Sequence, residues 1–359
     1  MNICIIGINL TSLILSKLLI NNGLLVSIFS FNYKKYNLSS RTIGISRDNI
    51  NFINKKIINL KNRNLCKIKN IKIYTDDRKE ILNFKNKTDN LFSIIELNKF
   101  YNILYNDLKN KKLFNINKIK EKNFHKIFYG TKYDIVINCE KNNFITRKYF
   151  SKTIKKNYNS IAHTCLIYHQ KIKNFVASQY FTNLGPIAFL PISSKTTSIV
   201  FSSYKKKRLD DKKFENFIFS YSNKLKINKF SKISRANLNF SSARRYYNNN
   251  ILLFGDALHQ IHPLAGQGFN MTIRDLKVLS SLIENKKNLG LTIDSTLLKD
   301  FEEETKSKNL IFSFGVNLIQ NFFEIKKELG IKKIDHLIKY LGKKDFTNNF
   351  LLNAADKGL

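Results

Sequence analysis

The chain has 359 residues and a formal net charge of +36, from 62 lysines and arginines against 26 aspartates and glutamates; this length allows a large core and more than one domain. No apolar run reaches 18 residues, so the sequence predicts no transmembrane helix, and the four separated cysteines (Cys4, Cys66, Cys139 and Cys165) predict no disulfide framework. The basic charge alone does not indicate nucleic acid, because the chain has no nucleic-acid-binding motif and no basic stripe with interleaved aromatic residues.

The amino terminus is expected to form a strand, a helix and a second strand, at residues 2–6, 10–20 and 24–29. The turn between such a strand and helix binds the pyrophosphate of dinucleotides when it carries the pattern G-x-G-x-x-G. Here only Gly7 is retained, while Asn9 and Ser12 occupy the other two glycine positions. Ser30 stands where an acidic residue would bind the ribose hydroxyls. One glycine of three does not by itself identify a dinucleotide site, and a site here would have a weakened contact to the adenosine ribose.

The segment GDALHQIHPLAGQGFN at residues 255–270 is the most informative part of the chain. Apolar residues then recur at helical spacing, at Phe269, Ile273, Leu276, Leu279 and Ile283. The predicted helix begins near Gly266 to Gly268, and its first turn has N–H groups without intrahelical partners and a positive dipole end. The two glycines let a planar or anionic group approach this backbone, and Asp256 offers a carboxylate to ligand hydroxyls. The segment therefore predicts a ligand site.

Residues 255–275 resemble the second FAD-binding motif of the single-component flavin-dependent aromatic hydroxylases. They are most similar to the ubiquinone-biosynthesis branch, whose pattern is GDAAH-x-x-HPLAGQG-x-N-x-x-x-x-D. The matching residues are Asp256, His259, His262, Pro263, Gly266, Gln267, Gly268, Asn270 and Asp275. Residues 41–46, 178–191 and 242–246 resemble further segments of this family in the same order, so the resemblance spans roughly residues 1–320.

The resemblance implies an α/β fold with an α+β insert. Its parts are a Rossmann-like FAD-binding domain of the p-hydroxybenzoate hydroxylase type, a mainly β substrate domain and C-terminal helices. We expect a discontinuous FAD-binding domain at residues 1–66, 93–150 and 245–325. The substrate domain fills residues 67–92 and 151–244, and residues 326–359 form a basic amphipathic tail.

The implied activity is FAD-dependent monooxygenation, in which a hydroperoxyflavin hydroxylates a polyprenylated aromatic ring in ubiquinone biosynthesis. FAD is the implied cofactor, with O2 and NAD(P)H or another electron donor as co-substrates. The residues carried over as FAD-binding are Gly7, Asn9, Ser12, Arg41, Asp256, Pro263, Gly266, Gln267, Gly268 and Asn270. His262 and Pro263 are the candidates beside the flavin edge, and Phe189 and Pro191 are the candidates for the substrate pocket. No metal site is implied.

Two other interpretations stay open. The first is that residues 251–270 form a purely structural strand, turn and helix. A metal site at His259 and His262 is not favoured, because no cysteine or glutamate stands beside them at ligand spacing.

The second alternative is a non-catalytic scaffold subunit of a ubiquinone-biosynthesis complex. It is motivated by the changed positions Asn9, Ser12, Ser30, Glu140 and Lys141, the last two standing where the family has A-D-G. The well-preserved loop that faces the flavin favours the enzyme.

The carboxyl-terminal stretch 324–344 has apolar residues at helical spacing among seven lysines. A basic amphipathic helix of this kind fits an anionic membrane surface, and it equally fits a packed terminal helix with a solvated lysine face. Residues 1–30 do not read as a signal peptide. We therefore expect a cytoplasmic protein, peripheral on the cytoplasmic face of the inner membrane. Its expected partners are a polyprenyl-phenol substrate and other ubiquinone-biosynthesis proteins, and not nucleic acid.

Overall fold

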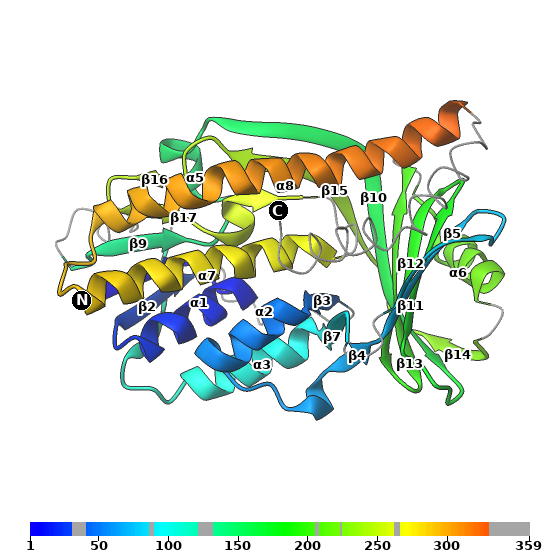
Figure 1. The fold of residues 1–359 in the computed structure, drawn as a ribbon, viewed down its shortest axis with the longest axis horizontal. Helices are drawn as coiled ribbons and strands as arrows, with labels where there is room; N and C mark the ends of the chain where they lie inside the picture. Colours follow the sequence, from blue (N-terminus) through cyan, green and yellow to red (C-terminus); the bar gives the residue numbers. More distant parts are fainter. Residues whose placement is uncertain are drawn as a thin grey trace.

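The computed structural model describes residues 1–30, 41–85, 90–120, 132–204, 208–222, 225–261 and 266–329, with side chains in the last helix as far as residue 318. Three sheets and the helices around them make up this part of the chain. The long strand β10 (Thr153–His169) connects the part rich in helices with the large antiparallel sheet, as Figure 1 shows. None of the helices described is long and apolar enough to cross a membrane.

A six-stranded sheet forms the centre of the helix-rich part. Its strands, in spatial order, are β16 (Tyr247–Asn248), β17 (Ile251–Leu253), β9 (Ile135–Asn138), β1 (Asn2–Ile6), β2 (Leu25–Ser30) and β8 (Phe114–Lys118). All neighbours pair in parallel except β16 with β17. Cys4, Ile5 and Ile6 are completely buried. Both faces of the sheet are therefore covered, which explains why its strands are continuous apolar runs.

The helices of this part are α1 (Leu10–Asn21), α3 (Leu97–Leu108), α5 (Phe144–Tyr149), α7 (Gln267–Asn288) and α8 (Ser295–Leu329). Apolar side chains of α1, α3, α7 and α8 join those of the sheet in one core. Even Lys17 of α1 is buried, and its ammonium lies 2.6 Å from the carboxylate of Asp107 on α3. Helices α7 and α8 lie side by side (Figure 1). This packing fixes where the first turn of α7 lies.

A nine-stranded sheet forms most of the second part. Its strands, in spatial order, are β18 (His259–Gln260), β15 (Ser234–Ala243), β10, β13 (Thr196–Ser203), β12 (Gly185–Ser193), β11 (Val176–Thr182), β5 (Asn70–Thr75) and β6 (Glu80–Lys85), and β14 (Ile227–Phe230) also pairs with β10. One face is covered by α6 (Asp211–Tyr221), whose Phe214 and Ile218 pack against Ile199 and Phe201. The other face is turned toward the three-stranded sheet.

The three-stranded sheet joins the two parts. It consists of β3 (Thr42–Ser46), β7 (Phe92–Glu96) and β4 (Cys66–Ile68), and β3 continues into α2 (Arg47–Phe52). Ile68 and Ile94 pack against Ala177 and Leu190 of the nine-stranded sheet. The hydroxyl of Thr42 donates to the Ser198 hydroxyl of β13 at 2.8 Å. β3 is therefore held by the nine-stranded sheet at one end, while its later residues lie against α7.

This architecture confirms the predicted fold class, an α/β part with a mainly β second part. The strands of residues 67–92, β5 and β6, extend the sheet formed by residues 151–244. One short strand crosses the expected domain boundary, because β18 pairs with β15. The expected tail at 326–359 lies outside the described residues from 330 onward.

Gly185 and Gly315 provide a matched pair of alanine substitutions with opposite expected effects. Gly185 has φ +135°, and a Cβ there would lie 1.9 Å from the Ser202 carbonyl oxygen. Gly315 is in α8, with open space around it. We expect Gly185→Ala to lower the free energy of unfolding by at least about 2 kcal/mol, and Gly315→Ala to raise it by about 0.5–1 kcal/mol. Urea unfolding measures both, and equal midpoints would contradict the crowding at Gly185.

Candidate functional site

Three loops meet at the carboxyl edge of the six-stranded sheet. They follow β1, β9 and β17, whose parallel strands end at the same edge, where ligands bind in folds of this class. Gly7 has φ +93°, and a Cβ on it would lie 2.9 Å from the Cβ of Glu140. Gly255 has φ +62°, and its Cβ would lie 2.7 Å from the Thr11 methyl group. Only glycine fits at either contact, and the two glycines therefore let the three loops pack closely against one another.

The turn before α1 is closed by its own side chains. Asn9 is the N-cap residue, and its Oδ1 accepts from the Ser12 backbone N–H at 2.9 Å. The Ser12 hydroxyl accepts in return from the Asn9 backbone N–H at 2.8 Å. The Asn9 amide also donates to the Cys139 carbonyl at 3.0 Å. Asn9 and Ser12 thus use helix donors that an anionic ligand would otherwise take.

Asp256 and Lys141 bring opposite charges to the same edge. Asp256 is exposed in a single 3₁₀ turn, Gly255–Ala257. Lys141 is half-buried, and its ammonium donates to the side-chain oxygen of Gln260 at 2.6 Å. Burial lowers the pKa of Lys141, while the nearby Asp256 carboxylate raises it and Lys155 lowers it further. Burial, with a smaller effect of Asp256, raises the pKa of the Cys139 thiol, so this cysteine stays protonated near neutral pH.

The first turn of α7 is open. Gly266 is its N-cap residue, with φ +68°, and no side chain in the described part of the chain caps the helix. A Cβ on Gly266 would meet only the backbone of Gly44, at 3.6 Å or more, and one on Gly268 would meet Ile261 at 3.7 Å. Among the described residues, the buried side-chain oxygen of Gln267 has no hydrogen-bond partner. The first N–H groups of α7 have no intrahelical acceptor, so this helix start offers backbone donors and one unbonded side-chain oxygen.

Asn270 fastens this helix start to β3 and α2. Its side-chain amide donates to the Gly44 carbonyl at 2.9 Å, and its Oδ1 accepts from the Ser46 backbone N–H at 2.9 Å. Asn49 donates to the same oxygen at 3.0 Å. Asn270 is almost completely buried. Its side chain is thus occupied within the protein, and any role toward a cofactor is to hold the backbone in place.

His259 and Asp275 form a buried pair behind the loop. Nε2 of His259 lies 2.5 Å from Oδ2 of Asp275, and each side chain is only 1% exposed. Oδ1 of Asp275 accepts from the Asn309 amide of α8 at 2.9 Å. β18, α7 and α8 therefore meet at a single carboxylate. Two of the nine residues matched in the motif are accounted for by this structural pair.

The two substrate-pocket candidates lie on the same face of β12. Phe189 packs among the side chains that face α6, next to the ring of Tyr180. Leu190, its neighbour on β12, faces the three-stranded sheet instead. Side chains alternate along a strand, so Pro191 shares the face of Phe189. Phe189 therefore lies on the face of β12 that packs toward α6, whereas Leu190 packs on β4 and β7 of the three-stranded sheet. A role for Phe189 and Pro191 at the substrate pocket stays a prediction.

The remaining candidates fall into two groups. Arg41 is exposed at the start of β3, three residues before Gly44. His262 and Pro263 lie outside the described residues, so their places beside the flavin remain predictions. In the ranges that the structure describes, no group of three or more histidine, cysteine or acidic side chains is arranged to hold a metal.

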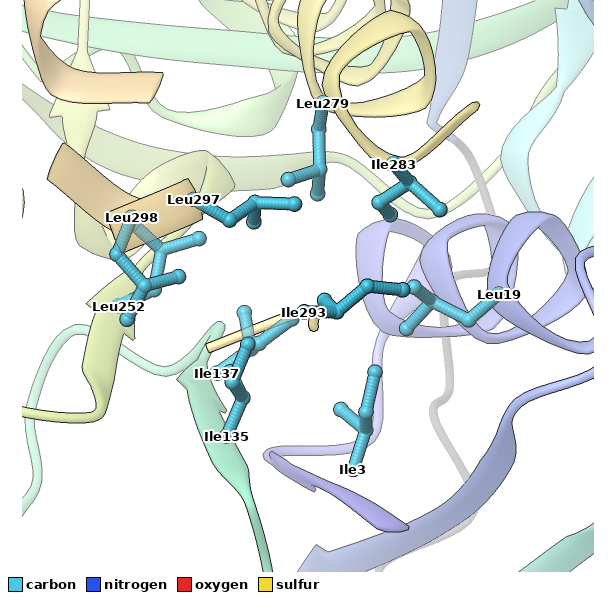
Figure 2. Close-up of a pocket in the computed structure, with 10 residues that line it drawn as sticks. All are labelled: Ile3, Leu19, Ile135, Ile137, Leu252, Leu279, Ile283, Ile293, Leu297 and Leu298. Carbon is cyan, nitrogen blue, oxygen red and sulfur yellow. The ribbon is translucent and has the colours of Figure 1, made fainter. Parts of the chain in front are cut away.

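A small cavity inside the six-stranded sheet domain is not a substrate site. It has a volume of about 10 Å³. As Figure 2 shows, aliphatic side chains surround it, from Ile3 and Ile137 of the sheet to Leu279 of α7 and Leu298 of α8. A space of this size holds at most one water molecule, and an apolar one stays dry. It is a packing defect in the core.

Sequence reasoning missed Gly44, Thr11 and Gln260. Gly44 lies in the Arg41–Ser46 segment, and an isolated glycine in a strand signals a close backbone approach, so this residue was within reach of prediction. Thr11 and Gln260 carry no such signal. Their importance comes from contacts with residues more than 100 positions away in the chain.

Comparison with known proteins shows one matching family model and several similar proteins. A family model described as FAD binding domain matches residues 151–306. The chain is 27% identical over 194 residues to ubiquinone biosynthesis monooxygenase COQ6, mitochondrial, of Caenorhabditis elegans, covering 42% of this chain and 43% of that protein. It is 30% identical over 154 residues to 3-demethoxyubiquinol 3-hydroxylase of Escherichia coli, covering 39% and 38%. The chain spans about half or less of the length of these curated relatives.

Solved structures confirm the fold. The p-nitrophenol 4-monooxygenase PnpA of Pseudomonas putida superposes with a TM-score of 0.78 at 10% identity, over 99% of this chain and 98% of that one. HpxO of Klebsiella pneumoniae, in complex with FAD and uric acid, gives a TM-score of 0.74 at 10% identity, over 100% and 96%. At this identity the likeness establishes the fold alone.

The residues of the two ends of the site fit FAD unequally. The backbone N–H groups in the first turn of α7 fit an electron-rich ring edge that accepts hydrogen bonds, and the unbonded side-chain oxygen of Gln267 fits a donor on the ligand. The start of α1 offers less, because Asn9 and Ser12 already bond to its backbone. The cofactor thus fits best at its flavin end.

Loss of the buried pair should be far more costly than loss of an exposed one. We expect Asp275→Asn to lower the free energy of unfolding by about 2–3 kcal/mol, because His259 and Asn309 lose a charged acceptor. The control is Glu303→Gln, which removes the exposed pair with Lys299 and should change stability by less than about 0.5 kcal/mol. Thermal unfolding at pH 7 distinguishes them. Equal shifts would show that the pair does not join the loop to α7.

Proposed function

We propose that this chain is an FAD-dependent monooxygenase that hydroxylates a polyprenylated aromatic ring in ubiquinone biosynthesis, and the FAD binding domain matched at residues 151–306 supports this. The observation that carries the proposal is the uncapped start of α7 at Gly266, held against Gly44 by Asn270. The relatives whose names include ubiquinone biosynthesis or hydroxylation support the substrate class. Because the chain covers under half of their length, the activity and the substrate belong to the proposal.

The chain's residues position, polarise and shield the reacting groups. FAD, reduced by NAD(P)H or another donor, supplies activated oxygen for insertion into an electron-rich ring. The first turn of α7 would direct backbone N–H groups and a positive dipole end toward a bound flavin, where they would stabilise negative charge on the reduced ring. Gly266 and Gly268 would keep this approach free of side chains. The exposed Asp256 would accept hydrogen bonds from the ribityl hydroxyls.

The scaffold alternative rests on a specific observation. Asn9 and Ser12 close the α1 turn on itself, as a protein that no longer binds a dinucleotide would allow. The open α7 turn argues against it, since a helix start without a cap is left unsatisfied unless a ligand or water bonds to it. Flavin content distinguishes the two functions.

Flavin retention should depend on Gly266 beyond its effect on folding. Gly266 and Gly290 both have φ +68°, and Gly290 has open space around it. An alanine at either position costs about 1–2 kcal/mol of backbone strain. We expect the purified protein to be yellow and Gly290→Ala to remain so, while Gly266→Ala and Asp256→Ala release FAD on gel filtration. Colourless wild-type protein that takes up no added FAD would favour the scaffold.

The substrate is tested by the products of catalysis. Flavin-loaded protein given NAD(P)H, O2 and a short-chain prenylphenol should yield a ring-hydroxylated product with one oxygen atom from O2. Mass spectrometry with labelled oxygen measures the incorporation. NAD(P)H oxidation that the phenol does not stimulate, with peroxide as the sole product, would refute the substrate class.

We also propose that the protein works at an anionic membrane surface in the cytoplasm. On the outer side of α8, Ile311, Phe314 and Leu318 recur at spacings of three and four, and are 58%, 52% and 69% exposed. The lysine-rich stretch 324–344 follows on the chain. An apolar helix face that is followed in the sequence by lysines suits the headgroup region of anionic lipid, and docking there would give a long prenyl tail direct access to the enzyme.

Liposome sedimentation tests this docking. We expect binding to phosphatidylglycerol vesicles that is lost when residues 324–359 are removed, and that falls at least several-fold in the triple variant Ile311→Ser, Phe314→Ser, Leu318→Ser. Vesicles of phosphatidylcholine alone are the control for charge. Undiminished binding of the truncated protein would disprove a role for the tail.

A further inference from the structure

We propose, as an extension that rests on the proposed function, that Lys141 is the phosphate-binding cation of the FAD site. Its ammonium binds the diphosphate of FAD and replaces contacts that the changed turn before α1 no longer offers. Three features support this assignment: where Lys141 lies, what the α1 turn lacks, and how Lys141 itself is partnered.

Lys141 lies at the edge where the diphosphate of a dinucleotide crosses the sheet. It follows β9, which lies between β1 and β17. The preceding residue, Glu140, packs on Gly7, and the Cys139 carbonyl accepts from the Asn9 amide. The backbone that carries Lys141 is therefore fixed against the first turn of α1, the place where a diphosphate rests in βαβ folds.

The α1 turn has lost part of its own ability to hold an anion. A glycine-rich turn presents free backbone N–H groups to phosphate. Here the N–H groups of Asn9 and Ser12 are bonded to each other's side chains at 2.8 and 2.9 Å. The first turn of α1 also contains no basic side chain. Tight binding of a dianion at this turn therefore needs a cation from a neighbouring loop.

Lys141 is a half-buried cation whose charge is not matched by a close anion. Its hydrogen bond goes to the neutral amide of Gln260. In the described part of the chain, no carboxylate forms an ion pair with it. Asp256 acts on it from a greater distance, and Lys155 adds a second positive charge nearby. A phosphate oxygen is a stronger acceptor than an amide, so a diphosphate is the better partner.

The test compares flavins that differ in phosphate. Full-length protein freed of flavin is titrated with FAD and with riboflavin, and quenching of flavin fluorescence reports the dissociation constant. Lys141→Met keeps the apolar stem and removes the charge. We expect it to weaken FAD binding by about tenfold or more, the loss of one charge-assisted hydrogen bond, and to leave riboflavin binding unchanged. Lys141→Arg should restore most of the FAD affinity.

Two further measurements complete the experiment: the salt dependence of FAD binding, and a control variant at a distant lysine. Wild-type affinity for FAD should fall as ionic strength rises, and this slope should flatten in Lys141→Met. Lys195→Ala, in the exposed turn between β12 and β13, is the matched control and should change nothing. Equal FAD affinity in Lys141→Met, or an equal loss for FAD and riboflavin, overturns the assignment. If Lys141→Met does not fold, equal salt slopes for FAD and riboflavin in the wild type overturn it instead.

These outcomes separate the inference from the function on which it rests. Wild-type protein that binds neither flavin refutes the proposed function. Wild-type protein that binds FAD while Lys141→Met binds it equally well refutes only the role of Lys141. An unchanged FAD affinity together with a raised KM for NAD(P)H would assign Lys141 to the electron donor and overturn the proposal.

Discussion

The structure depends on the close approach of two backbones, that of β3 at Gly44 and that of the α7 N-terminus at Gly266. Asn270 makes this approach permanent, because its amide bonds to the carbonyl of Gly44 and to the N–H of Ser46. β3 is tied in turn to the nine-stranded sheet through Thr42 and Ser198. One side chain thus couples the helix start proposed to face the flavin to the sheet proposed to hold the substrate. If the buried side-chain amide of Asn270 lost these hydrogen bonds, the fold would lose stability, so Asn270 favours the arrangement in which β3 and the start of α7 lie together.

The two ends of the site are built on opposite principles. At α7 no described side chain caps the helix start, an unbonded side-chain oxygen lies beside it, and neighbouring elements hold it in place. At α1 the turn is closed by the reciprocal bonds of Asn9 and Ser12, so it is stable without a ligand. On the proposed function, such a protein would hold its cofactor mainly at the ring end. The proposed binding of the phosphates would then rest on side chains such as Lys141 on adjoining loops.

Periodicity and glycine placement were sufficient to predict the secondary-structure elements and the ligand loop from the sequence. The strand, turn and helix at residues 251–288 follow from local patterns, and the family motif added the cofactor. Phe189 shows the limit of this reasoning. It lies on β12, and this strand presents Leu190 and not Phe189 to the three-stranded sheet. A pattern that is apolar on both faces does not reveal which face meets which partner, so the sequence alone does not decide which of these side chains faces a substrate.

By itself the sequence determined the strand, helix and strand at the amino terminus and the helix start near Gly266, because each shows in the spacing of neighbouring residues, and the family resemblance supplied the two-part architecture. Only the tertiary structure decided that Gly7 packs on Glu140, Gly255 on Thr11 and Gly266 on Gly44. The same holds for the carboxylate of Asp275, which joins the loop to α8. These contacts link positions tens to hundreds of residues apart, and they exist only after the chain has packed. Local spacing therefore identified the ligand loop, whereas the fold decided which side chains surround it.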